Sequence, residues 1–204
     1  MTTYETEIMN LEDSINTHLF NNKLCVENLT KQTSRIHEIT KQLIQARDNG
    51  NTIFVMGNGG SGSTASHFVS DLLKTAITKN SKRFKAISLV DNVPVNLAWS
   101  NDVSYDNIFL EQLKNFLNKN DVVIGFSGSG NSQNLVNAFE YAKTNDAITI
   151  AISGMGGGKI SKLVDFSLVV PSDDMLLIES MHLLLCHCII HVIRQQGIPK
   201  FTYD

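Results

Sequence analysis

Short apolar runs alternate with helix-like segments along most of the chain, and this alternation limits the possible folds most strongly. Five runs are rich in β-branched residues and almost continuously apolar: Thr52–Met56, Lys85–Val90, Asp121–Phe126, Ala147–Ile152 and Phe166–Val170. Such runs are typical of strands buried on both faces. Helix-like segments lie between and after them: Ser63–Ile77, Asp106–Asn118, Ser132–Thr144, Lys159–Val164 and Asp173–Gln196. The pattern predicts an α/β fold with a doubly wound, five-stranded parallel sheet.

The first 49 residues follow a different pattern. From about Tyr4 to Asn49 there is no proline and no glycine, and apolar residues such as Ile36 and Ile39 recur at helical spacing. Two helices are expected, divided near Asn21–Asn22 and ended by the C-cap signal Asn49-Gly50. We therefore expect a single domain over residues 1–204, with an N-terminal helical extension (1–49) and an α/β core (50–204) that ends in a long helix.

Composition excludes several classes of protein. A chain of 204 residues with 42% hydrophobic residues suits one soluble domain, and a net charge of −3 gives no reason to expect nucleic acid or a membrane surface as partner. Three cysteines without CxxC spacing suggest neither a disulfide framework nor a cysteine zinc site. The N-terminus has no signal pattern, and histidines interrupt the apolar C-terminal run. We expect a cytoplasmic protein that spans no membrane.

Two of the predicted strands end in loops of the same chemical kind. The first is Gly57–Ser63, GNGGSGS, and the second is Ser127–Ser132, SGSGNS. In doubly wound folds ligands bind beyond the carboxyl ends of the strands. Glycines let an anion approach the backbone, and N–H groups at a helix start and serine hydroxyls donate hydrogen bonds to phosphate oxygens. The loops predict a site for a monophosphate with an uncharged polar body.

A nucleotide cofactor is a poorer interpretation of the same loops. Gly57-x-Gly59-x-x-Gly62 matches the dinucleotide pattern, but that pattern needs an acidic residue about 20 positions later to hold the ribose. Here the second predicted strand ends at Val90-Asp91, more than 30 residues from Gly57. No Gly-Lys-Ser/Thr sequence is present either, so a Walker A loop is excluded. No nucleotide cofactor is expected.

Gly57-Asn58-Gly59-Gly60-Ser61 leading to His67, together with Ser127–Ser132, resembles the sugar-isomerase (SIS) domain family. More narrowly, the chain resembles the phosphoheptose isomerases, which interconvert sedoheptulose 7-phosphate and glycero-manno-heptose 7-phosphate. The similarity covers nearly the whole chain, including Glu179, His182 and His187 of the last predicted helix. It implies an SIS/flavodoxin-like fold and a homotetramer whose active sites lie between subunits, joined partly through the N-terminal helices.

The resemblance also implies roles for particular residues. Phosphate would be held by the loop residues Gly59, Gly60, Ser61, Ser127, Ser129 and Ser132. The sugar would be lined by Asn58, Asp91, the Ser100–Asp102 stretch and Glu179. Asp71 takes the position of a catalytic glutamate and His187 that of a catalytic histidine. One zinc ion per site would be bound by His67, Asp71, Glu179 and His187.

The chain departs from the family pattern at two of these positions. Asp71 is one methylene shorter than glutamate, and Glu179 puts a carboxylate where the family has a neutral glutamine. Reasoning from the residues alone, His67 and Asp71 are four apart and share a helix face, as Glu179 and His187 roughly do at a spacing of eight. If the two helices meet, the carboxylates and imidazoles can act as acid and base or bind a divalent metal.

Several alternatives remain at this stage. The chain is expected to be a phosphoheptose isomerase, but a non-catalytic SIS regulator or adaptor, such as the replication-initiator-binding type, and an isomerase of another sugar phosphate are open. The presence of His187 favours an enzyme. His182 and His191 are interpreted as core or interface residues, and Cys186 and Cys188 as packing residues, because neighbours on a helix do not share a face.

Overall fold

The computed structural model describes residues 10–201, and the expected helix start near Tyr4 lies outside that range. Helix α1 (Leu11–Leu29) and helix α2 (Thr33–Asn49) are joined by the 3-10 turn η1 (Thr30–Gln32). The predicted division near Asn21–Asn22 is wrong, because Asn22 Nδ2 donates to the His18 carbonyl 2.9 Å away and so stays within the helix. Gly50 ends α2 at φ +79°, as the C-cap signal predicts.

The sheet confirms the predicted class. Five parallel strands pair in the order β2-β1-β3-β4-β5. Their bounds are β1 (Thr52–Gly57), β2 (Lys85–Ser88), β3 (Val122–Ser127), β4 (Ile148–Ser153) and β5 (Phe166–Val169). This order is that of a flavodoxin-like, doubly wound sheet, in which the strand order reverses between β1 and β3 while all strands stay parallel.

The remaining helical elements connect or follow these strands. They are α3 (Gly59–Ser70), the π-helical turn η2 (Asp71–Thr75), α4 (Val93–Asp102), η3 (Tyr105–Asn107), α5 (Ile108–Phe116), α6 (Gln133–Thr144), η4 (Met155–Gly157), α7 (Ile160–Leu163) and α8 (Met175–Gln195). Helix α4 was not expected from the sequence. It contains no buried residue, so it lacks the repeating apolar stripe by which an amphipathic helix is recognised.

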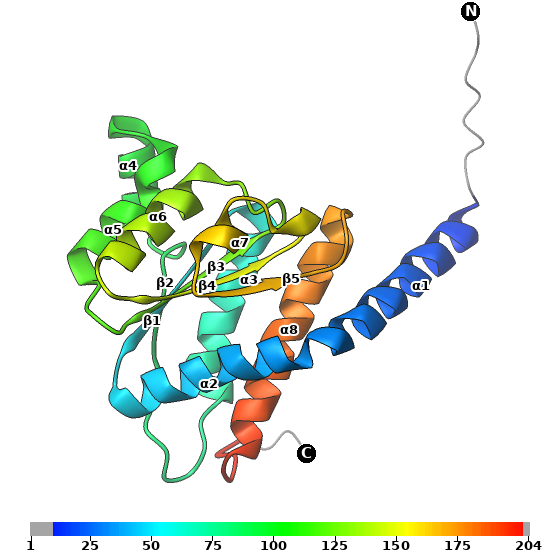
Figure 1. Cartoon of the computed structure of the whole chain (residues 1–204), viewed down its shortest axis with the longest axis horizontal. Coiled ribbons are helices and arrows are strands. Elements are labelled where there is room, and N and C mark those ends of the chain that lie inside the picture. The colour runs from blue at the N-terminus through cyan, green and yellow to red at the C-terminus, as the bar shows by residue number, and fades with distance from the viewer. Residues whose placement is uncertain (1–9, 202–204) are drawn as a thin grey trace, which may run out of the picture.

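Helices cover both faces of the sheet (Figure 1). One face packs against α2, α3 and α8, with Phe68, Leu43 and Leu185 among its buried residues. The other face packs against α5, α6 and α7, with Phe109 and Phe139 at its centre. The two faces are therefore separate apolar layers, and the loops at the strand ends lie where the layers meet.

Helix α8 has the length and composition of a membrane-crossing helix, with a mean hydropathy of 1.9 in its most apolar window. Half of that window is nevertheless buried inside the structure. Its inward residues Ile178, Met181 and Ile189 belong to the apolar layer beneath the sheet, and Figure 1 shows it lying beside α3. Its apolar character is therefore explained by its place in the core of the fold.

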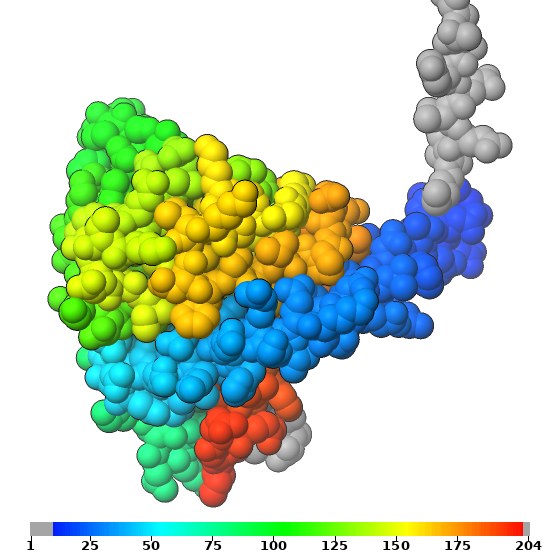
Figure 2. All heavy atoms as spheres, viewed as in Figure 1, coloured from blue at the N-terminus to red at the C-terminus, as the bar shows by residue number. Residues whose placement is uncertain are grey.

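Helix α1 projects beyond the body formed by the sheet and its covering helices (Figure 2). Leu11, Ile15 and Leu19 recur every four residues along it, and between 59% and 82% of each residue is exposed. Phe20 and Leu24 add further exposed apolar surface to the same helix. An apolar stripe of this kind on an extended helix marks a surface suited to contact with another protein chain.

Candidate active site

The two glycine- and serine-rich loops meet at the point where the strand order of the sheet reverses. β1 and β3 are hydrogen-bonded neighbours, but α3, which follows β1, packs on one face and α6, which follows β3, on the other. The first loop runs from Gly57 into α3 and the second from Ser127 into α6. Doubly wound proteins bind ligands in the crevice at this topological switch point.

A cavity of about 290 Å³ lies between the loops, and we call it the loop cavity. The structure brings together there most of the residues for which a phosphate- or sugar-binding role was expected: Asn58, Gly59, Gly60, Ser61, Ser127, Ser129, Ser132 and Glu179. Phe126, Gly128 and Met175 complete its wall.

Hydrogen bonds within the second loop orient two of its serines. Ser127 Oγ accepts from the Gly130 N–H at 3.0 Å, and Ser129 Oγ accepts from the Asn131 N–H at 3.2 Å. Each hydroxyl keeps its own hydrogen for another acceptor, since a hydroxyl both accepts and donates. The loop is thereby arranged to present O–H donors to an anion in the loop cavity.

A third glycine-rich segment, Gly154–Gly158, supports the second loop from behind and was not singled out in the sequence. Gly130 has φ +66°, and an added Cβ there would collide with the Gly157 backbone carbonyl. The Gly130 carbonyl also accepts from the Ile160 N–H at 3.1 Å. The sequence GMGGG of this segment could have indicated the contact, because glycine is needed where two backbones approach this closely.

A second cluster of functional side chains lies further along α3 and α8. The Nε2 atoms of His67 and His187 are 2.9 Å apart. Asp71 Oδ2 is 3.4 Å from His67 Nε2 and 3.8 Å from His187 Nε2. The two histidines are exposed, whereas only 15% of the Asp71 side chain is accessible. The helices that carry these residues therefore do meet, as the catalytic interpretation requires.

Asp71 begins the π-helical turn η2, in which its carbonyl accepts from the Ala76 N–H at 2.8 Å. Thr75 Oγ1 donates a 2.8 Å hydrogen bond to Asp71 Oδ1. The two carboxylate oxygens are thus distinguished, with Oδ1 bound to Thr75 and Oδ2 facing the imidazoles. π-helical turns inside α-helices frequently occur at functional sites. Neither this turn nor the contact from Thr75 is indicated by a sequence pattern.

Three of the four expected zinc ligands are gathered in this cluster. One ligand atom each from His67, Asp71 and His187 lies within 4.8 Å of the others. Two imidazole nitrogens and a carboxylate oxygen form a donor set that zinc accepts, and three protein ligands leave a coordination position open, as in catalytic zinc sites. The residues present therefore fit a zinc ion.

Glu179 lies outside that group in this structure, and its role as a fourth zinc ligand stays a prediction. Its carboxylate lies against Gly60 in the loop cavity, where an added Cβ on Gly60 would meet it. Eight helical residues separate Glu179 from His187, which corresponds to about 12 Å along α8. A spacing of eight residues keeps two side chains on roughly one helix face without bringing them to one point.

Asp91 and the Ser100–Asp102 stretch line neither the loop cavity nor the cavity beside the histidines. Asp91 is exposed and accepts a short hydrogen bond from Ser66 Oγ on α3. The Ser100–Asp102 stretch forms the exposed end of α4. The side chains of these residues are therefore set apart from the loop cavity within one chain.

A cavity of about 650 Å³ opens beside the histidine and aspartate cluster. His191 lies in its wall together with Arg194 and Gln195, so this histidine is an exposed residue and not part of the core. His182 by contrast is completely buried, and burial lowers its pKa to about 4. Cys186 is buried as expected, and burial, then the charge of Asp71, raise the pKa of its thiol.

The Asn58 side chain is held by residues that the sequence did not point out. It forms a reciprocal amide pair with Asn134 of α6, with both N–O distances at 2.9 Å. The Tyr105 hydroxyl in η3 donates to Asn58 Oδ1 at 2.8 Å. Neither Asn134 nor Tyr105 lies in a recognisable motif, so only the fold reveals these contacts.

The geometry defines a sugar-phosphate type of site at the switch point of a doubly wound sheet. The sequence profile described as "SIS domain" matches residues 21–154, more than half of the 204 residues of the chain. The chain belongs to the SIS domain family.

Within that family, the chain is similar to phosphoheptose isomerases. The enzyme of Helicobacter pylori (strain P12) is 38% identical over 178 residues, which cover 85% of this chain and 92% of that protein. The structure of the phosphoheptose isomerase from Francisella tularensis superposes with a TM-score of 0.84 at 30% identity, covering 92% of this chain and all of the other. The phosphoheptose isomerase from Neisseria gonorrhoeae gives a TM-score of 0.85 at 27% identity, covering 91% of this chain and 100% of that one.

Proposed function

We propose that this protein is an aldose–ketose isomerase that converts sedoheptulose 7-phosphate to glycero-manno-heptose 7-phosphate. One observation carries the proposal: helices α3 and α8 both contribute to the loop cavity and to the cluster of His67, Asp71 and His187, in which Asp71 directly follows α3. Ser61 and His67 are separated by about 9 Å along α3, at 1.5 Å per residue. A phosphate held by the loops would therefore direct the opposite end of an extended seven-carbon sugar toward the cluster.

Asp71 is the proposed base in this reaction. Its carboxylate would take a proton from C1 of the open-chain ketose while His187 gives a proton to the oxygen on C2, which produces the enediol. Asp71 would then return the proton to C2 while His187 removes the hydrogen of the C1 hydroxyl. Both groups recover their starting protonation states, so no other reactant is consumed. Proton transfer by positioned side chains contributes typically about a hundredfold to ten-thousandfold to rate.

The remote phosphate supplies binding energy for this step. Ser127 and Ser129 carry oriented hydroxyls, and Ser61 lies in the first turn of α3, where backbone N–H groups favour an anion. Holding the sugar at its phosphate fixes the position of C1 and C2 relative to Asp71. Energy from non-reacting parts of a substrate is used in this way to lower the barrier at the reacting carbons.

As the alternative to these acid–base roles of Asp71 and His187, the group His67, Asp71 and His187 would hold one zinc ion. When bound, zinc supplies Lewis acidity that polarises the carbonyl of the open-chain sugar. The donor set and the mutual distances of the three residues support this assignment. Glu179 is proposed to contact the substrate, because it lines the loop cavity with the serines.

The chain is further proposed to form a cytoplasmic homotetramer with active sites between subunits, as one SIS domain over residues 1–204. The exposed stripe of Leu11, Ile15 and Leu19 on α1 supports assembly. An apolar cavity of about 420 Å³ where the end of α1 and the start of α2 meet α8 adds surface of the same kind. Asp91 and the Ser100–Asp102 stretch are proposed to reach a sugar only in such an assembly.

Incubation with sedoheptulose 7-phosphate and a panel of other ketose phosphates tests the function. The expected result is formation of the aldose form of the heptose phosphate. Chromatography of the sugar phosphates measures it. If the protein turns over a different ketose phosphate and not sedoheptulose 7-phosphate, its substrate is another sugar phosphate. That result would be consistent with the carboxylate of Glu179 in the loop cavity. Binding of sugar phosphates with no turnover of any would instead support a regulator or adaptor.

A further inference from the structure

Asn58 separates two cavities. On one side it lines the loop cavity with Ser127, Ser129 and Ser132. On the other it lines a smaller cavity of about 180 Å³, together with Tyr105 and residues of α4 and α5. Any movement of the Asn58 side chain therefore changes the wall of the loop cavity.

The amide of Asn58 is almost fully used by protein contacts. Its Oδ1 accepts from both Asn134 Nδ2 and the Tyr105 hydroxyl, and one hydrogen of its Nδ2 is donated to Asn134 Oδ1. A carboxamide has two acceptor positions and two donor hydrogens. The side chain therefore has one N–H left for a ligand and no acceptor. These three hydrogen bonds, with the Asn134 amide and the Tyr105 hydroxyl, fix the orientation of the Asn58 side chain.

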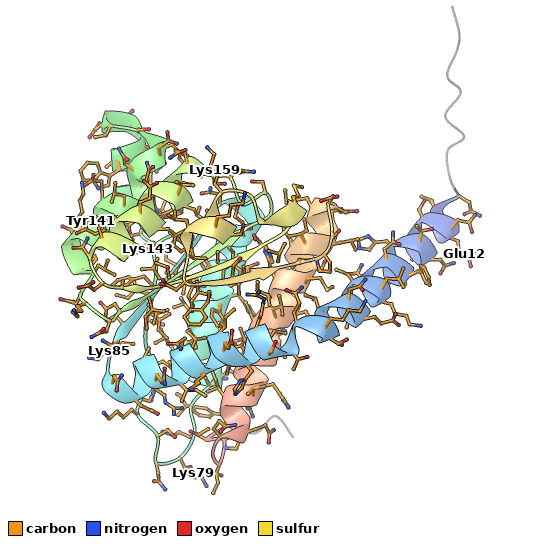
Figure 3. All side chains as sticks on the ribbon, in the orientation of Figure 1. Glu12, Lys79, Lys85, Tyr141, Lys143 and Lys159 are labelled. Carbon is orange, nitrogen blue, oxygen red and sulfur yellow. The ribbon has the colours of Figure 1, made fainter. Side chains whose placement is uncertain are left out.

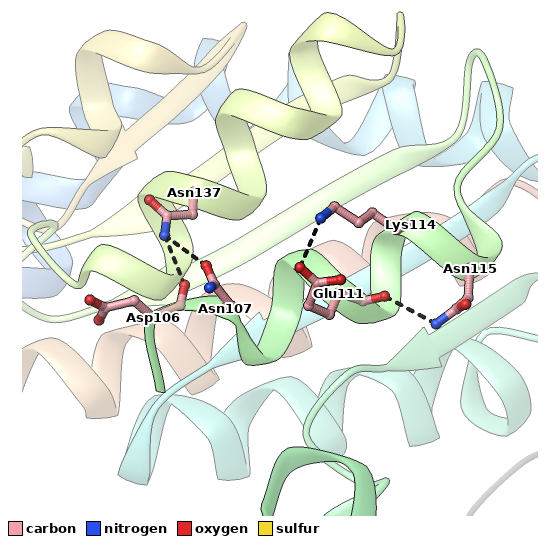
Figure 4. A network of polar contacts seen from close by, with 6 residues as sticks. All are labelled: Asp106, Asn107, Glu111, Lys114, Asn115 and Asn137. Carbon is pink, nitrogen blue, oxygen red and sulfur yellow. Dashed lines mark hydrogen bonds and ion pairs between the residues drawn. The ribbon is translucent and has the colours of Figure 1, made fainter. Parts of the chain in front are cut away.

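The partners of Asn58 are themselves firmly placed. Asn134 is 1% exposed and lies in the first turn of α6, two residues after Ser132. Asn137, one turn further along α6, donates to the Asp106 carbonyl at 3.0 Å and to Asn107 Oδ1 at 3.3 Å (Figure 4). These bonds attach η3, and with it Tyr105, to the helix that begins at the second loop.

We propose that Tyr105 and Asn134 form a clamp that acts through Asn58 to hold the two phosphate-binding loops at a fixed separation. Asn58 belongs to the first loop, whereas Asn134 and the attached turn η3 move with the second. The clamp is made of positioning residues, because Tyr105 and Asn134 touch Asn58 and line no part of the loop cavity. The inference rests on the proposed phosphate site and adds the residues that set its geometry.

Tyr105→Phe tests the clamp, because it removes one hydroxyl and leaves the ring of a half-exposed residue. The dissociation constant for inorganic phosphate, measured by calorimetry, is expected to rise about fivefold, the equivalent of one net hydrogen bond. The KM for the sugar phosphate should rise similarly while kcat stays within about twofold, since the histidine cluster is untouched. Tyr141→Phe on α6 is the matched control, because Figure 3 places Tyr141 at the outer edge of the molecule, and it should bind phosphate normally.

A double-mutant cycle separates the clamp from a general structural effect. In an Asn58→Ala background, Tyr105→Phe should produce no further loss of phosphate affinity, because its partner is already gone. An undiminished loss in that background, or normal phosphate binding by Tyr105→Phe, would overturn the proposal. If Asn58→Ala does not fold, the phosphate dissociation constants of Tyr105→Phe and Tyr141→Phe are enough to test the clamp. Phosphate binding without isomerisation would refute only the proposed function, and wild-type protein that binds no phosphate would refute the clamp.

Discussion

The Nε2 atoms of His67 and His187 lie 2.9 Å apart, although 120 positions of sequence separate the two histidines. They meet because α3 and α8 pack side by side in the apolar layer on one face of the sheet. Asp71 completes the group one helical turn after His67. The proposed chemistry thus depends on the contact between two helices and not on a local motif.

Asp71→Asn is expected to lower kcat about a thousandfold, because the amide cannot take the C1 proton. Phosphate affinity should remain within about twofold of wild type, since Asp71 lies outside the loop cavity. Steady-state kinetics and calorimetry with inorganic phosphate provide the two measurements. Substantial turnover by this variant would remove Asp71 from the role of base.

Thr75→Val is expected to lower kcat about tenfold, as it removes the hydroxyl that binds Asp71 Oδ1 at 2.8 Å. Valine has nearly the same shape, so the π-helical turn should persist. Thr75→Ser keeps the hydroxyl and should restore most of the rate. Equal rates for the valine and serine variants would show that Thr75 does not orient the carboxylate.

Zinc content distinguishes a three-ligand site from a four-ligand site. His187→Ala should lose the metal, because one of the three clustered donors is removed. Glu179→Gln should keep one zinc per chain and change mainly the KM, because Glu179 lies in the loop cavity. Metal analysis after purification without chelators provides the measurement. Loss of zinc from the Glu179→Gln variant would restore the four-ligand assignment.

Burial of His182 makes stability depend on pH. The pKa of His182 in the folded protein, about 4, lies below the ordinary histidine value of 6.5, because the buried site disfavours the charged ring and the nearby Ser153 backbone offsets this only partly. The unfolded chain therefore binds more protons between these values, and stability falls as pH decreases from 6.5 toward 4. The loss is about 3 kcal/mol from this one group.

His182→Leu should remove that part of the pH dependence in denaturant unfolding. At pH 7 it should be neutral or stabilising, because the contact of His182 with the Ser153 backbone does not reach hydrogen-bond geometry, so leucine leaves fewer buried polar atoms without a partner among residues 10–201. An unchanged difference in unfolding free energy between pH 7 and pH 4.5 would show that other groups control acid stability.

The apolar stripe on α1 is expected to hold subunits together. Replacing Ile15 and Leu19 with glutamate places charge on that surface and should weaken assembly at least about 100-fold. Asn16→Glu combined with Asn21→Glu, at two exposed polar positions on the same helix, is the charge-matched control. Light scattering measures the mass of each species. An unaltered mass for the double variant would place the subunit contacts elsewhere.

Local sequence patterns predicted much of the fold. The five strands were found within two residues of their observed ends, because parallel strands buried on both faces leave continuous apolar runs. Helix α4 was missed since it buries nothing and carries no periodic signal. The division between the first two helices was misplaced because Asn22 hydrogen-bonds within its own helix instead of breaking it.

By itself, the sequence determined the five strands, their parallel pairing and the two loops that can accept a phosphate, because these depend on local periodicity and on glycine and serine at strand ends. Only the tertiary structure decided which distant side chains meet. It separated Glu179 from His187, joined Thr75 to Asp71, and brought Asn134 and Tyr105 to Asn58. Such contacts depend on how helices pack and rotate against one another, and residue spacing along a single chain does not encode that rotation directly.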